Sequence, residues 1–238
     1  MWQKQSERQG CHYYRASQGI GKFLTEHYLQ KGAAVFGCGR GVGTVLHSRY
    51  THFSLDVSDE KAVVGMVRTV GRFNGKIDAL INNAGIASMN HMATTPISRV
   101  KEIFNTNFFG SFIFCREVAK IMARKGGGAI VNFSTVATPY NLEGEAAYAA
   151  SKAAVESFTR ICVREFGNAG VRANAVGPTP IKTDLTKSVS AGKMSALINR
   201  QAIRRWGEFE DVANVTDFFI NDKSAFVTGQ VIYLGGVF

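Results

Sequence analysis

The sequence predicts a single α/β domain in which helices cover both faces of a parallel β-sheet. Short apolar runs alternate with longer segments of helical periodicity along the chain. A length of 238 residues suits one well-buried domain, or at most two small ones, and no Pro- or Ser-rich linker divides it. Several strand candidates are followed by polar or Gly-rich residues, and ligands of parallel sheets bind at those strand ends.

The net charge of +10 is compatible with nucleic acid, an anionic surface or a small anionic ligand. The basic residues are scattered singly or in pairs such as Arg124-Lys125, and no basic helix with interleaved aromatic residues stands out. We therefore expect a solvated basic surface first and a phosphate-bearing ligand next, with no nucleic-acid partner and no metal site.

The cysteines and the N-terminus indicate a cytoplasmic protein. The four cysteines are widely spaced and form no C-x-x-C motif, which favours reduced thiols. Residues 1–9 lack the apolar core of a signal peptide. No apolar run reaches the ~18 residues that a membrane span needs.

The first elements in the chain suggest a phosphate site. After ten polar residues, Cys11–Tyr14 is a short strand candidate with little apolar character. Residues 16–22 form a Gly-rich turn, and apolar residues at helical spacing follow it. Such a turn at the start of a helix presents backbone N–H groups to phosphate. The same Gly-x-Gly spacing also occurs in ordinary turns.

The next strand candidate, residues 33–38, is followed by Arg40. Sites built for NAD usually have an acidic residue at this strand end, where it binds the ribose hydroxyls. An arginine there favours a 2′-phosphate and therefore NADP(H). The alternative is an arginine on the surface without a ligand.

The middle of the chain continues the alternation of strands and helices. After a short connection over residues 41–50, we expect a strand at 53–57 and a helix that begins at Ser58-Asp59-Glu60. Residues 78–81 form a buried strand, which Asn82-Asn83-Ala84-Gly85 closes. One long helix is expected over residues 100–123. Asn107 lies inside it, where an asparagine is unfavourable unless its side chain has a task.

The C-terminal part contains three more strands and a long helix. A strand at 129–134 delivers Ser134 and Thr135, and the helix over 146–166 carries Tyr148 and Lys152. Strands are expected at 171–176 and 226–234. Residues 179–205 are polar, weakly patterned and expected to move.

Tyr148 and Lys152 are four residues apart and lie one turn apart on one helix face. A phenol normally titrates near ~10, and an adjacent ammonium favours the phenolate. The pair is therefore a plausible device for proton transfer near neutral pH. Taken alone, the same spacing also describes an ordinary half-exposed helix face.

Six motifs together resemble the short-chain dehydrogenases/reductases, and most closely the 3-oxoacyl-[acyl-carrier-protein] reductase-like members. They occur in the family's order and spacing between about residues 16 and 236, and they are Ser17-Gln18-Gly19-Ile20-Gly21, Asp56-Val57, Asn82-Asn83-Ala84-Gly85, Asn107-x-x-Gly110, Tyr148-x-x-x-Lys152 and Pro178 to Thr183. The resemblance implies a Rossmann-type, doubly wound parallel sheet.

The resemblance also implies roles for individual residues. Tyr148 is the expected acid/base, while Lys152 is expected to lower the pKa of Tyr148 and bind the nicotinamide ribose. Asn107 is expected to hold a water that links Lys152 to solvent, and Thr135 takes the place of the family's serine. The expected cofactor-binding residues are Arg15, Ser17, Gln18, Gly19, Ile20, Gly21, Arg40, Asp56, Val57, Asn83, Ala84, Gly85, Tyr148, Lys152, Pro178, Ile181 and Thr183.

The sequence departs from the family's pattern at several places. Tyr14-Arg15 replaces the Thr-Gly that opens the glycine turn, and residues 1–15 resemble nothing in the family. A frame error or a replaced segment upstream of Ala16 is a hypothesis that an unbroken native frame in the resequenced gene would contradict. Pro178-Thr179 replaces Pro-Gly. The connection between Arg40 and Asp56 is short, so its helix is expected to shrink to a turn or two.

These observations predict an NADP(H)-dependent reductase of ketones, acting as a homotetramer on a small carbonyl or alcohol substrate. Residues 184–205 match the family's substrate lid. Residues Leu185, Val189, Met194, Leu197 and Ile198 suggest an apolar pocket, bordered by Thr138, Tyr140 and Asn141. The altered glycine turn is also compatible with a second function. In this alternative the protein is a non-catalytic relative of the family that binds a dinucleotide weakly or not at all.

Overall fold

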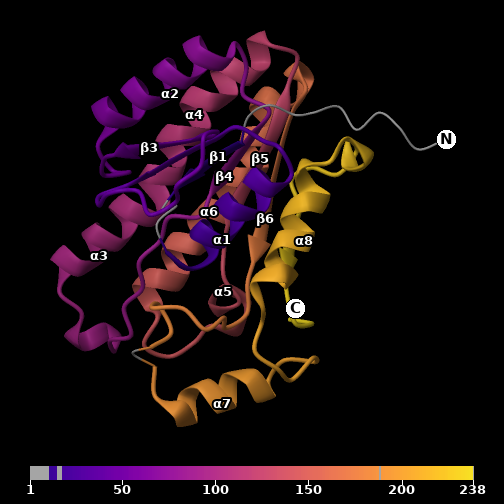
Figure 1. The fold of residues 1–238 in the computed structure, drawn as a ribbon. Coiled ribbons are helices and arrows are strands. Elements are labelled where there is room, and N and C mark those ends of the chain that lie inside the picture. Colours follow the sequence, from indigo (N-terminus) through magenta and orange to yellow (C-terminus); the bar gives the residue numbers. More distant parts are fainter. Residues whose placement is uncertain (1–10, 15–17, 188, 238) are drawn as a thin grey trace.

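A seven-stranded parallel sheet forms the centre of the structure, a computed structural model that describes residues 11–14, 18–187 and 189–237, with side chains from residue 18 onward (Figure 1). The strand order is β3-β2-β1-β4-β5-β6-β7. The strands are β1 Cys11–Tyr14, β2 Val35–Gly39, β3 Tyr50–Ser54, β4 Ala79–Asn82, β5 Gly128–Phe133, β6 Val171–Gly177 and β7 Val231–Tyr233. The direction of strand addition reverses between β1 and β4, which creates a ligand-binding crevice at the carboxyl ends of the strands.

Helices cover both faces of the sheet, as the sequence predicts. Helices α1 Gly19–Gln30 and α8 Phe209–Ile220 pack together on one face. Helices α2 Glu60–Asn74, α4 Gly110–Arg124 and α6 Ala146–Phe166 cover the other (Figure 1). Each face has its own apolar core, and the doubly wound α/β fold is confirmed.

Helix α2 shows how local sequence determines these elements. The Asp59 side chain accepts a hydrogen bond from the backbone N–H of Ala62 and caps the helix start. Val63, Val67 and Val70 follow at helical spacing, and all are buried. Gly75 ends the helix with a left-handed backbone (φ 73°), which a residue without Cβ adopts at little cost.

The structure divides the long helix predicted over residues 100–123. It consists of α3 Ile97–Phe104, a π-helical turn η2 at Asn105–Phe109, and α4. Hydrophobic periodicity continues through the wide turn, so the sequence pattern does not reveal the extra residue.

Three further expectations differ from the structure. Residues 41–49 contain no helix, so the connection that was expected to keep a turn or two is fully irregular. The strand expected at 53–57 lies earlier, at β3, and the strand expected at 226–234 shrinks to β7. Residues 179–205, expected to be irregular, contain helix α7 Ala191–Asn199, which lies beyond the carboxyl ends of the strands (Figure 1).

Short helical segments complete the chain: η1 Met92–Thr94, α5 Ala137–Tyr140, η3 Gly167–Ala169 and η4 Asp222–Ser224. The weak strand candidate β1 pairs with both β2 and β4, so its polar sequence occupies a central position. Cys115 and Cys162 are buried free thiols. Among the described residues, no helix combines the length and apolarity required for a membrane crossing, and no cluster of metal ligands occurs.

Candidate active site

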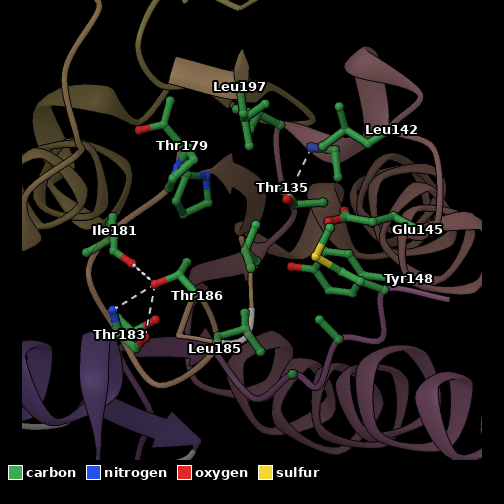
Figure 2. A pocket seen from close by; sticks show the side chains of 18 of the residues that line it. Thr135, Leu142, Glu145, Tyr148, Thr179, Ile181, Thr183, Leu185, Thr186 and Leu197 are labelled. Carbon is green, nitrogen blue, oxygen red and sulfur yellow. Dashed lines mark hydrogen bonds between the residues drawn. The ribbon is translucent and has the colours of Figure 1, made fainter. Parts of the chain in front are cut away.

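A cavity of about 460 Å³ opens at the carboxyl ends of the strands. Its walls come from the start of α1, the residues after β4, the end of β5, the start of α6 and the segment from Pro178 through α7 (Figure 2). Tyr148, Lys152 and Thr135, three of the four predicted catalytic residues, line it. The fold therefore brings together residues that lie far apart in the sequence.

Tyr148 lies on α6 with 8 % of its surface exposed. Its hydroxyl is hydrogen-bonded to Thr135, which is also buried and accepts a hydrogen bond from the backbone N–H of Ala137 (3.2 Å, Figure 2). Burial raises the pKa of Tyr148 to about 12, the Thr135 hydrogen bond lowers it, and the negative charge of Glu145 raises it further.

Lys152 is not among the causes of this shift, and its expected lowering of the Tyr148 pKa stays a prediction. The ammonium of Lys152 donates instead to the backbone oxygen of Phe133, 2.8 Å away. Burial also lowers the pKa of Lys152 to about 8, so the low dielectric disfavours both charged forms. The spacing of the two residues reveals their proximity but not how deeply they are buried.

Asn107, the fourth predicted catalytic residue, is fully buried in the π-helical turn. Its side-chain amide donates to the backbone oxygen of Ile86 and to Ser151 Oγ, both 3.0 Å away, and its Oδ1 accepts from the Ile86 N–H. A Cβ placed on Gly85 would lie 3.4 Å from Lys152 Nζ and 3.6 Å from Asn107 Oδ1. The Gly85 backbone therefore lies next to both residues.

The end of β5 is tied to α6 through three successive residues. Phe133 contacts Lys152 and Thr135 contacts Tyr148, as described above. Between them, Ser134 Oγ donates to the buried carboxylate of Glu156, one turn after Lys152. Tyr233 of β7 donates to the same Glu156 oxygen at 2.7 Å. Ser134 also lines the cavity, but its hydroxyl is engaged by Glu156, which supports Thr135 as the hydroxyl beside Tyr148.

Gln18, Gly19 and Ile20, at the start of α1, line the cavity, and their role as a phosphate turn stays a prediction. The Gln18 side chain does not cap the helix with a hydrogen bond. Gly19 has φ 55°, and a Cβ there would lie 3.4 Å from Thr183 Cγ2. This close approach joins the glycine turn to the segment after β6.

Five more of the expected cofactor-binding residues also line the cavity, namely Asn83, Gly85, Pro178, Ile181 and Thr183. Thr186 fixes the local chain, since its hydroxyl donates to the backbone oxygen of Ile181 and accepts from the N–H of Thr183 (Figure 2). A backbone cradle of glycines and an uncapped helix start suits a dinucleotide.

The remaining expected residues lie outside the cavity lining. Gly21, Val57 and Ala84 are buried, and Gly110 packs against Val57. Arg40 is exposed at the end of β2. Asp56 accepts hydrogen bonds from the Ser58 hydroxyl and backbone N–H, which lower its pKa, and the charge of Arg40 lowers it further. Arg15 and Ser17 lie outside the described residues.

The substrate side of the cavity is apolar. Leu185, Val189, Met194 and Leu197 line it as predicted, whereas Ile198 does not. The expected border residues Thr138, Tyr140 and Asn141 are also absent from the lining. Leu142 and Glu143, next in the chain, line the cavity instead. Thr138 and Tyr140 lie in the short helix α5, and Asn141 ends it.

Three functional features were not recognised in the sequence, namely Ser151, Glu145 and the Phe133 carbonyl that accepts from Lys152. Ser151 accepts from Asn107 and donates to the backbone oxygen of Tyr148 (2.7 Å), so it joins two predicted catalytic residues. Glu145 lines the cavity beside Tyr148. Its position three residues before Tyr148 was a usable signal, because that spacing places both on one helix face. The Phe133 carbonyl leaves no such signal.

Comparison with known sequences agrees with this geometry. Residues 15–236 match the family model described as Enoyl-(Acyl carrier protein) reductase. The 3-oxoacyl-[acyl-carrier-protein] reductase FabG of Thermotoga maritima is 32 % identical, over 95 % of this chain and 96 % of its own. FabG of Vibrio harveyi is 30 % identical, over 93 % of each chain.

Solved structures show the same fold. The NADP-bound structure of ElxO has a TM-score of 0.87 and 26 % identity, covering 95 % of this chain and 96 % of its own. A tyrosine-to-phenylalanine variant of ElxO with NADPH bound is equally similar, with a TM-score of 0.87 and 26 % identity, over 94 % and 96 % of the two chains.

Proposed function

The chain belongs to the short-chain dehydrogenase/reductase family of oxidoreductases, and on that basis we propose that it uses NADP(H) to reduce a ketone, of the 3-oxoacyl type or another class, to a secondary alcohol. One observation carries the proposal: the Tyr148 and Thr135 hydroxyls and the Lys152 ammonium line the same cavity as Gly19 and Gly85 of the expected cofactor turn and loop. The first group suits proton transfer and the second suits a dinucleotide.

Bound NADPH supplies the hydride for this reaction. The Tyr148 hydroxyl donates its proton to the carbonyl oxygen, while the Thr135 hydroxyl donates a hydrogen bond that positions that oxygen. Lys152 stabilises the negative charge that forms on Tyr148. Asn107 is proposed to hold a water that returns a proton to this pair. With a pKa of about 12, Tyr148 is protonated at neutral pH and therefore carries the proton that the reduction needs.

Arg40 is proposed to bind the 2′-phosphate of NADP(H), because it is exposed at the carboxyl end of β2 where an NAD site has an acidic residue. Replacing Arg40 with Ala is expected to raise the Kd for NADPH about tenfold or more, since hydrogen bonds to charged groups contribute roughly 1.5–3 kcal/mol. The Kd for NADH should stay nearly constant. Fluorescence titration of both cofactors measures the effect.

Arg124→Ala is the matched control, because it removes an equal charge at the end of α4, just before β5 begins and away from the carboxyl end of β2 where Arg40 lies. Equal losses for NADPH and NADH would contradict the phosphate assignment. The same titration tests the second reading, a non-catalytic relative with an altered glycine turn at Arg15. Micromolar NADPH binding by the native protein supports the enzyme, and absence of binding supports the relative.

The protein is further proposed to be a cytoplasmic homotetramer. Phe109, Phe112 and Ile161 are 37–51 % exposed around the η2, α4 and α6 helices, where the Phe112 and Phe158 rings also lie 5.2 Å apart. Exposed aromatic residues of this kind suit an interface between subunits. Light scattering should give about four times the chain mass of 25.9 kDa, and a monomeric mass would refute the assembly.

A further inference from the structure

Glu145 places a carboxylate in the substrate half of the cavity. It is the residue that precedes helix α6, and its backbone oxygen accepts from the N–H of Ala149. Tyr148 follows three residues later, in the first turn of the helix. Figure 2 shows the Glu145 carboxylate pointing into the cavity beside the Tyr148 ring.

Along the chain, Tyr148 lies between two residues of opposite charge. Lys152, one turn later, lies beside Gly85 and Asn107 at the cofactor end. Glu145, one turn earlier, lies beside Leu142 at the substrate end. A group attached to the substrate carbonyl would therefore meet Glu145 when the carbonyl oxygen meets Tyr148.

The neighbours of Glu145 neutralise it only in part. Burial raises the pKa of Glu145, and the positive charge of Lys193, on α7, lowers it. The other nearby cation, Arg200, is occupied by Tyr140, whose ring lies 4.1 Å from the guanidinium and whose backbone oxygen accepts its hydrogen bond. The carboxylate remains available to a ligand.

We propose that Glu145 is a specificity-determining residue that selects carbonyl substrates with a neutral hydrogen-bond donor, such as a hydroxyl, next to the carbonyl and rejects those with a carboxylate there. This inference rests on the proposed reductase function. A carboxylate oxygen accepts a hydrogen bond from the donor, whereas two carboxylates a few ångströms apart repel strongly in a partly buried site.

Three ketones of equal chain length and one ester test the selection. Wild-type kcat/KM with NADPH should be at least tenfold higher for 1-hydroxybutan-2-one than for butan-2-one. It should be at least tenfold lower for 2-oxobutanoate than for its neutral methyl ester. In Glu145→Gln, which keeps the size and removes the charge, the ratio of ester to acid should fall at least fivefold. Glu165→Gln, which removes a charge from the exposed end of α6 outside the cavity lining, should leave that ratio unchanged.

The acid-to-ester preference is measured independently by calorimetric binding of the same ligands to wild type and Glu145→Gln. Weak acid binding in the wild type that improves at least fivefold in Glu145→Gln supports the selection. Equal acid and ester affinities, or an unchanged ratio in Glu145→Gln, overturn it. If no ketone is reduced, the proposed reductase function fails, and the binding ratios still decide the role of Glu145.

Discussion

Replacing Tyr148 with Phe is expected to lower kcat for ketone reduction by about 10²–10⁴-fold, the usual contribution of a positioned general acid. Phenylalanine fills the same buried volume but removes the hydroxyl that is hydrogen-bonded to Thr135. The Kd for NADPH should change by less than about threefold, because the cradle at Gly19 and Gly85 is untouched. Steady-state kinetics and fluorescence titration separate the two effects.

Thr159→Val is the matched control for this variant. It also removes a buried hydroxyl from α6, one that hydrogen-bonds the side chain of Asn132 of β5 at 2.8 Å. This change should reduce thermal stability through the lost hydrogen bond and leave kcat nearly constant. Full turnover in Tyr148→Phe would refute the assigned proton donor.

Replacing Lys152 with Met is expected to have the next largest effect, a loss of about 10²-fold or more in kcat. Methionine keeps the unbranched shape but cannot stabilise charge on Tyr148 or donate to the Phe133 carbonyl. Because Lys152 has a pKa of about 8, wild-type kcat should be highest below pH 8 and fall as the pH rises through that value. The pH profile of Lys152→Met should lack this inflection.

The contribution of Lys152 to stability should change with pH in the opposite direction to its effect on activity. Burial lowers the pKa of Lys152 from 10.5 to about 8, so the unfolded chain binds more protons between those values. Its contribution to the free energy of unfolding therefore increases from pH 8 to 10.5, while activity decreases. Denaturant titrations of the wild type and of Lys152→Met between pH 8 and 10.5 measure the difference in their free energies of unfolding. An inflection near pH 8 that persists in Lys152→Met would assign it to another group.

Much of the fold and of the site was predictable from the sequence. Continuous apolar runs followed by polar residues located the strand ends, and the four-residue spacing placed Tyr148 and Lys152 on one face. The pKa of Tyr148 was not predictable, because its direction depends on burial by walls from five different elements. The π-helical turn was also hidden, since one extra residue barely alters hydrophobic periodicity.

The strand β1 forms although its sequence did not predict a central strand. Its four residues lack the apolar character expected of a central strand, but parallel pairing with β2 and β4 satisfies the backbone of Cys11–Tyr14 whatever the side chains are. Neighbouring strands here supply what local propensity does not.

The contacts of Asn107 join two walls of the cavity to each other. By holding Ile86 through both amide atoms and Ser151 through its nitrogen, this side chain fastens the loop after β4 to the helix that carries Tyr148. Those two walls can only travel together. The segment that contains α7 lies outside this Asn107 network, so we expect residues there, rather than the proton-transfer groups, to set how fast product leaves.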